Sequence, residues 1–227
     1  MKSQAMNQHA LLLGHRGARG VKGVAENTLP SFDLALAQGC DGFEFDVRLT
    51  ADGQAVVCHD AKTRGSEIAR SSAQELALPF LRDVLTRYKC TAFLDIELKV
   101  PGLERITADL IRTHAPARGL VISSFLPEVL QTIHALDAAI PLGLICETRV
   151  QLSQWSQLPL AYVIPHYKLL SRRLIREIKT AGRKLFVWTV NVAAAMKRFS
   201  DWGVDGIISD RPERLAVTLG GRRASTD

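Results

Sequence analysis

The chain has 227 residues, of which 47% are hydrophobic, so it can bury one sizeable core. Its formal net charge is +6, but no basic run is interleaved with the 6% of aromatic residues, which argues against nucleic-acid binding. We expect no signal peptide and no membrane span, and the four cysteines without a CxxC pair indicate a reduced protein, so we predict a cytoplasmic location.

The first predicted elements are a strand and a helix joined by a glycine-rich loop. The apolar run over residues 11–14 predicts a strand that ends at His15 and Arg16. The helix begins at Asn27 or Thr28, since both residue types cap helices well, and a proline in the first turn supports this start.

The second strand alternates strictly between polar and apolar residues over positions 42–47. Because strand side chains switch faces at every residue, Glu44 and Asp46 share one face. Residues 50–53 carry a hairpin-turn signal, and the returning strand ends at His59. A tight turn would place His59 roughly opposite the two carboxylates.

Residues 60–78 are predicted to be polar and irregular, with a candidate helix start at residues 71–75, and a helix follows over residues 79–88. The third strand, over residues 92–99, alternates again. It places Glu97 and Lys99 on one face. A charge that points inward from an apolar strand is costly unless it is paired or bound to a metal.

The rest of the chain repeats the alternation of strand and helix. Strands are predicted at residues 119–125, 141–145, 161–165, 184–190 and 206–209, and helices at 101–114, 127–136, 149–157, 171–181, 193–202 and 211–219. Eight strand–helix units with short connections predict an α/β fold, a (β/α)8 TIM barrel. An open doubly wound sheet is the alternative, but no GxGxxG or Walker-type loop supports a nucleotide site in it.

We expect a single barrel domain over residues 10–219, with a short insertion after the second strand at about 60–80. A polar leader (1–9) precedes the domain, and a disordered tail (220–227) follows it.

Active sites of barrels lie at the C-terminal ends of the strands. The side chains expected there are His15, Arg16, Glu44, Asp46, Glu97, Lys99, Ser124, Phe125, His166, Trp188, Asn191 and Asp210. Three carboxylates that converge on one mouth suit a hard cation such as Mg²⁺ or Ca²⁺, although an internal ion pair of Glu97 with Lys99 is the alternative.

Two histidines at the ends of apolar runs suit proton transfer near neutral pH, and those are His15 and His59. Beside a cation and cationic side chains, such a pair fits the cleavage of a phosphodiester. Cys58 precedes His59, so a catalytic thiol is a further possibility.

The chain resembles the glycerophosphodiester phosphodiesterase family, in its cytoplasmic bacterial form. The resemblance covers nearly the whole chain and is carried by HRG at 15–17, ENTLPSF at 26–32, the block 41–60, DIELK at 95–99, SSF at 123–125, VWTVN at 187–191 and DGIISDRP at 205–212.

The resemblance implies hydrolysis of glycerophosphodiesters, such as glycerophosphocholine or glycerophosphoethanolamine, to sn-glycerol 3-phosphate and an alcohol. The substrate is therefore a small molecule. The residue roles that it implies are an acid–base pair of His15 and His59; a Mg²⁺ or Ca²⁺ site of Glu44, Asp46 and Glu97; phosphate contacts from Arg16 and Lys99; and a pocket lined by Phe125 and Trp188. His15 as base and His59 as acid is the preferred assignment, and either water or the glycerol 2-hydroxyl could attack first.

The segment over residues 60–80 is short and differs from the family pattern, where this region helps to cap the substrate site. A lysophospholipase D-type activity on lipid-bearing diesters is therefore one alternative. A non-catalytic barrel that binds a phosphorylated ligand is another. The alcohol specificity and the oligomeric state stay open.

Overall fold

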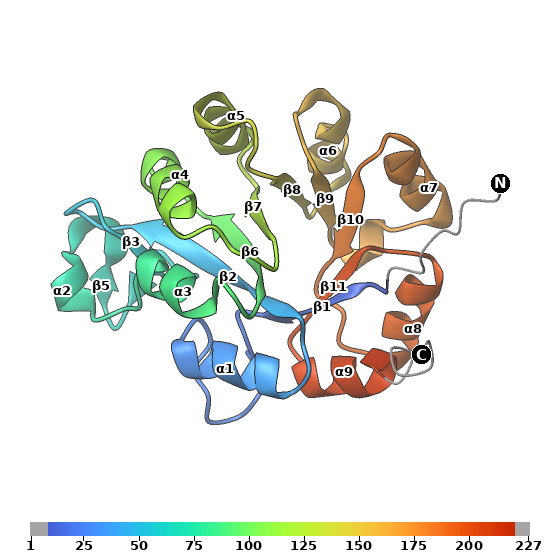
Figure 1. Cartoon of the computed structure of the whole chain (residues 1–227), viewed down its shortest axis with the longest axis horizontal. Helices are drawn as coiled ribbons and strands as arrows, with labels where there is room; N and C mark the ends of the chain where they lie inside the picture. Colours follow the sequence, from blue (N-terminus) through green and yellow to red (C-terminus); the bar gives the residue numbers. More distant parts are fainter. Residues whose placement is uncertain (1–8, 221–227) are drawn as a thin grey trace.

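Eight parallel strands close into a barrel in the computed structural model, which describes residues 9–220 (Figure 1). They are β1 (Leu11–His15), β2 (Gly42–Leu49), β6 (Phe93–Leu98), β7 (Leu120–Ser124), β8 (Leu142–Cys146), β9 (Tyr162–Pro165), β10 (Lys184–Val187) and β11 (Gly206–Ser209). The barrel closes because β1 pairs in parallel with both β2 and β11. The predicted (β/α)8 barrel is confirmed, and the alternative of an open sheet is wrong. Most of the predicted leader and tail, residues 1–8 and 221–227, lies outside the described residues.

Helices surround the barrel as an outer ring (Figure 1). They are α1 (Leu29–Ala37), α3 (Leu81–Tyr88), α4 (Glu104–Thr113), α5 (Pro127–Leu136), α6 (Arg149–Leu152), α7 (Arg172–Thr180), α8 (Ala193–Asp201) and α9 (Pro212–Gly220). Thr28 caps α1 by accepting a hydrogen bond from the Ser31 amide, which decides between the two predicted caps. Among residues 9–220, no helix is long and apolar enough to cross a membrane.

Several predicted elements are shorter in the structure than in the sequence analysis. The helix expected over 149–157 is divided into α6 and a 3-10 helix, η2 (Trp155–Gln157). Another 3-10 helix, η3 (Tyr167–Leu169), follows β9. Strand β10 stops at Val187, short of the expected end at residue 190.

The alternation of side chains along each strand separates two apolar clusters. On β6, Leu94 and Ile96 face the large core between the barrel and its helices. Phe93 faces the interior, where it packs against Tyr162 and Phe186 with ring centroids 6.3 and 5.7 Å apart. This aromatic layer fills the lower part of the barrel, so the polar residues higher on the same strands are left at the upper mouth.

A short antiparallel strand, β3 (Ala55–Val57), returns along β2 in a hairpin. Val57 pairs with Val47, and the Cys58 amide donates to the Asp46 carbonyl at 3.0 Å. This register brings His59, the next residue, to the mouth beside β2, close to the predicted position opposite the carboxylates.

The segment after His59 is more regular than the sequence indicated. It holds the two-stranded sheet of β4 (Lys62–Thr63) and β5 (Ser66–Glu67), a 3-10 helix, η1 (Ile68–Arg70), and the helix α2 (Ala73–Leu76), which project beside β3 in Figure 1. Ile68 and Leu76 pack with Val56 in a small apolar cluster. The helix α2 agrees with the helix start that the sequence indicates at residues 71–75, whereas β4, β5 and η1 were not predicted because they are too short to show a periodic pattern.

Candidate active site

A cavity of about 270 Å³ opens at the C-terminal mouth of the barrel. Its lining includes every side chain to which the family resemblance gives a role except Asp46, namely His15, Arg16, Glu44, His59, Glu97, Lys99, Phe125 and Trp188, whereas Ser124, His166, Asn191 and Asp210 lie outside it. Asp46 is buried just behind this lining and is only 1% exposed. The sequence-based choice of residues therefore converges on one place.

Three buried carboxylates form a cluster on one side of the cavity. Glu44 and Asp46 project from the same face of β2, and Glu97 pairs in register with Asp46 on the neighbouring strand. One oxygen from each of the three carboxylates lies within 4.8 Å of the others. Asp46 Oδ1 and Glu97 Oε1 are buried and accept no well-aligned hydrogen bond.

Backbone and amide groups fix the orientation of two of these carboxylates. The Arg16 amide donates to Glu44 Oε2 at 3.0 Å. The Asn27 side chain donates to Asp46 Oδ2 at 2.8 Å and accepts from the Asp46 amide at 3.3 Å. Asn27 has a φ of 57°, a left-handed conformation that asparagine adopts more readily than most residues. It was considered as a helix cap, but its side chain instead holds Asp46 in place.

The burial of the cluster changes its protonation. Desolvation raises the pKa of Glu44 well above its usual range, and repulsion from Asp46 and Glu97 adds to this. Desolvation and then Asp46 likewise raise the pKa of Glu97 to about 7. Burial would also raise the pKa of Asp46, but the charge of Lys99, the hydrogen bond from Asn27 and the charge of Arg16 hold it below its usual value. A divalent cation bound by the three oxygens would offset the repulsion, and the two oxygens that accept no well-aligned hydrogen bond fit such a ligand.

Two cationic side chains border the carboxylates. Lys99 Nζ lies 2.6 Å from Glu97 Oε1 and 3.3 Å from Asp46 Oδ1, so the ion pair considered as an alternative is present within the cluster. Arg16 lies between Glu26 and Asp46, with its Nη1 2.7 Å from Glu26 Oε1 and its Nε 3.3 Å from Asp46 Oδ2. Both cations also line the cavity, where they can contact a bound anion.

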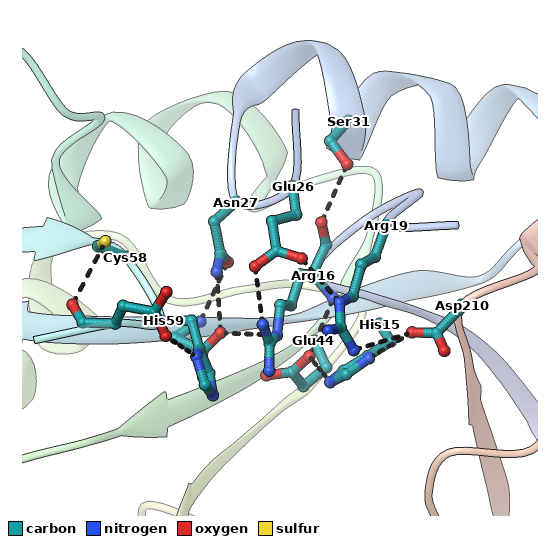
Figure 2. A network of polar contacts seen from close by, with 12 residues as sticks. His15, Arg16, Arg19, Glu26, Asn27, Ser31, Glu44, Cys58, His59 and Asp210 are labelled. Atoms are coloured by element: carbon teal, nitrogen blue, oxygen red, sulfur yellow. Dashed lines mark hydrogen bonds and ion pairs between the residues drawn. The ribbon is translucent and has the colours of Figure 1, made fainter. Parts of the chain in front are cut away.

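His15 is held by a carboxylate that lies at the other end of the chain. Its Nδ1 is 2.6 Å from Asp210 Oδ1, as Figure 2 shows, and Asp210 Oδ2 accepts from the Asn191 amide at 2.6 Å. The pairing with a carboxylate places a proton on Nδ1 and leaves Nε2 toward the cavity, 3.7 Å from Glu44 Oε2. Burial would raise the pKa of Asp210, but His15 and Asn191 lower it to about 2.

His59 has a similar partner on its own loop. Its Nδ1 lies 2.7 Å from Oδ1 of the exposed Asp60, and Arg48 Nε donates to the His59 carbonyl at 2.7 Å. Burial lowers the pKa of His59, against the opposing effect of Asp46 and Asp60. Each of the two histidines thus presents one free ring nitrogen, and they approach the cavity from different segments (Figure 2).

The opposite side of the cavity is apolar. Phe125 and Trp188 meet edge to face with ring centroids 5.8 Å apart, and Ile145 and Ile164 complete this wall. His166 lies beside Trp188 at a centroid distance of 5.2 Å.

Two residues that the sequence analysis considered for the site, Ser124 and Cys58, do not line the cavity. Ser124 is buried and donates to the Leu98 carbonyl at 2.8 Å. The Cys58 thiol lies outside the cavity lining, and burial raises its pKa, which disfavours the reactive thiolate.

Asp95 is a buried carboxylate for which we predicted no role. It lines the cavity floor, accepts from Ser123 Oγ at 2.6 Å, and has a pKa raised by burial to about 7. The alternation along residues 92–99 already places Asp95 on the inner face with Glu97. That pattern could therefore have identified it.

The chain is similar to known proteins over most of its length. The sequence profile of the Glycerophosphoryl diester phosphodiesterase family matches residues 15–85 and 96–214. A glycerophosphodiester phosphodiesterase of Caldanaerobacter subterraneus is 32% identical to the chain, over 90% of this chain and 96% of that protein.

Solved structures of similar proteins have the same fold. A glycerophosphodiester phosphodiesterase from Parabacteroides distasonis superposes with a TM-score of 0.85 at 27% identity, and the match covers 95% of this chain and 99% of that one. A phosphodiesterase from Oleispira antarctica was solved in complex with the product sn-glycerol-3-phosphate. It has a TM-score of 0.82 at 26% identity, and the match covers 93% of this chain and 97% of that one.

Proposed function

Because the chain belongs to the glycerophosphoryl diester phosphodiesterase family, we propose that it hydrolyses glycerophosphodiesters to sn-glycerol 3-phosphate and a free alcohol. Glycerophosphocholine and glycerophosphoethanolamine are the substrates we propose. The observation that carries this proposal is the meeting of two carboxylate-paired histidines and three buried carboxylates around one cavity. Phosphodiester cleavage needs proton transfer on both sides of the phosphorus and stabilisation of negative charge, and this set can supply both.

The two histidines would transfer the protons. His15, whose Nδ1 proton is held by Asp210, has Nε2 free to accept a proton from the attacking hydroxyl. His59 would donate a proton to the alkoxide as the bond from phosphorus to the leaving oxygen breaks. Burial lowers its pKa, but the negative charge of a bound phosphodiester favours its protonated form.

The carboxylates Glu44, Asp46 and Glu97 would hold a divalent cation, Mg²⁺ or Ca²⁺. Such a cation supplies Lewis-acid polarisation of a phosphate oxygen. Arg16 and Lys99 would contact the remaining phosphate oxygens, and Phe125 and Trp188 would pack against the carbon atoms of the substrate.

We expect the stabilisation by a divalent cation to depend on pH. The folded-state pKa of Glu97 is raised to about 7, so the metal-free protein loses stability as the pH rises from about 4.3 through 7. A cation needs these groups ionised and therefore binds more tightly at high pH. At about 100 times its Kd, the cation should raise the melting temperature by roughly 5–10 °C at pH 8.

At pH 5.5 the shift should be less than half as large at the same cation concentration. Differential scanning fluorimetry with and without Mg²⁺ or Ca²⁺ measures both values. An equal shift at the two pH values would contradict the protonation of this cluster in the metal-free protein.

Asp210 should act as a positioning residue for His15. In Asp210→Asn, both donors lose the charge of their acceptor, and one of the two, His15 Nδ1 or the Asn191 side-chain amide, meets an NH2 group instead of an oxygen. The imidazole is then no longer held in one tautomer and orientation. We expect kcat to fall on the order of 100-fold, with KM changed little. Steady-state kinetics check this, and a kcat within threefold of the parent would refute the positioning role.

Turnover of glycerophosphocholine compared with that of lysophosphatidylcholine tests the proposed substrate class. We expect the former to react with the higher kcat/KM, since the cavity of about 270 Å³ is small for an acyl chain. A preference for the lipid would instead establish a lysophospholipase D-type activity. Phosphate binding by calorimetry without turnover of either diester would establish a non-catalytic binding barrel.

A further inference from the structure

The apolar wall of the cavity carries one acidic side chain, Glu147, which has no part in the proposed catalytic set. It follows β8, where Ile145 belongs to the cluster inside the barrel and Leu144 and Cys146 belong to the outer core. A Cβ atom added at Gly143 would lie 2.7 Å from the Ile164 side chain, so position 143 also faces inward. Alternation therefore directs Glu147 toward the mouth of the barrel.

Aromatic rings follow the strands on either side of β8, and two of them, Phe125 and Trp188, line the same cavity as Glu147. β8 lies between β7 and β9, and these two strands are followed by Phe125 and His166. Trp188, after β10, contacts both rings, and its Nε1 donates to the Ile164 carbonyl at 3.0 Å. This hydrogen bond fixes the indole plane, so the wall is formed before any ligand binds.

The Glu147 carboxylate itself is available to a ligand. Its backbone amide donates at 2.9 Å to Oε1 of Gln151, the residue that forms a capping box with Thr148 at the start of α6, and this bond anchors the main chain. The side chain is exposed, and within residues 9–220 no Lys, Arg or His forms an ion pair with it.

The two sides of the cavity therefore carry different kinds of side chain. Its polar half lies on β1, β2 and β6, where His15, the carboxylate cluster and the two cations would hold the phosphate. In the cyclic order of the barrel strands, β8 stands opposite β1, so Glu147 lies across the cavity from His15. A diester held at the polar half would extend one of its two alcohol groups toward Glu147 and the aromatic rings.

We propose that Glu147 and the aromatic wall around Trp188 form a subsite for the alcohol half of the substrate when that alcohol is a cation, such as choline or ethanolamine. An ammonium group is attracted both by aromatic faces and by a carboxylate, whereas a neutral alcohol gains little from either. This inference rests on the proposed function and adds the specificity for the leaving alcohol.

The test compares three substrates in the full-length enzyme and in Glu147→Gln: glycerophosphocholine, glycerophosphoethanolamine and the neutral glycerophosphoglycerol. We expect kcat/KM for the two cationic substrates to fall about 3- to 30-fold, chiefly through KM. The value for the neutral substrate should change less than twofold. Glu128→Gln removes an exposed carboxylate of α5 outside the cavity and should leave all three values unchanged.

Two outcomes would overturn the subsite while leaving the proposed function intact. One is release of sn-glycerol 3-phosphate from all three substrates with an unaltered ratio of cationic to neutral turnover in Glu147→Gln. The other is an equal loss for all three substrates, which would place Glu147 at the shared glycerol or phosphate half. If the unaltered enzyme releases sn-glycerol 3-phosphate from none of them, both the subsite and the proposed function fail.

Discussion

Replacement of His59 by glutamine is expected to lower kcat for glycerophosphocholine by about 10²–10⁴-fold, because glutamine cannot transfer a proton. The loss should depend on the leaving group. Choline is a poor leaving group that needs a proton, whereas p-nitrophenol leaves readily as an anion. With the p-nitrophenyl ester of glycerol 3-phosphate, His59→Gln should therefore retain most of the parent activity.

His15→Gln is the matched variant for this experiment. If His15 is the base, its loss should depress turnover of both substrates by a similar factor, because the attacking hydroxyl is the same in each. If His15→Gln, and not His59→Gln, regained activity with the p-nitrophenyl ester, His15 would be the acid and His59 the base. Near-parent activity of either variant on glycerophosphocholine would remove that histidine from the acid–base pair.

Asp46→Asn is expected to lower kcat/KM by about 10²–10³-fold at a cation concentration that saturates the parent enzyme. Asp46 is the member of the cluster whose pKa is held below its usual value by Lys99 and Asn27, so it is the carboxylate that stays charged without a metal. Its replacement removes this charge from the cation site. Isothermal titration with Mg²⁺ and with Ca²⁺ should show a matching loss of affinity.

Asp109→Asn, which removes an exposed carboxylate of α4, serves as the control and should bind the cation as the parent does. Treatment of the parent enzyme with EDTA should abolish turnover, and added Mg²⁺ or Ca²⁺ should restore it. Full activity after exhaustive EDTA treatment would exclude the cation from the reaction, and unchanged cation affinity in Asp46→Asn would exclude this cluster as its site.

The parts of the site that could be predicted from the sequence are those governed by local periodicity. The alternation along β2 places Glu44 and Asp46 on one face, and the same rule places Glu97 and Lys99 together on β6. Because the carboxyl ends of parallel strands meet at one mouth, these residues were expected to converge, and they line or lie behind one cavity.

The parts that could not be predicted depend on closure of the barrel or on short irregular segments. Asp210 was recognised only as a strand-end residue, since its contact with His15 spans 195 positions and exists because β11 closes on β1. The contact of Asn27 with Asp46 depends on a left-handed loop residue, and the packing of Ile68 depends on elements too short for a periodic signal. Such contacts follow from tertiary geometry rather than from sequence pattern.

The most direct test of the central claim is the quantity of sn-glycerol 3-phosphate released from glycerophosphocholine by the purified full-length chain in the presence of Mg²⁺ or Ca²⁺. The account predicts sn-glycerol 3-phosphate and choline in equal amounts, and neither product when His15 and His59 are both replaced by glutamine. Phosphocholine and glycerol as the products, or no turnover with either cation, would contradict it.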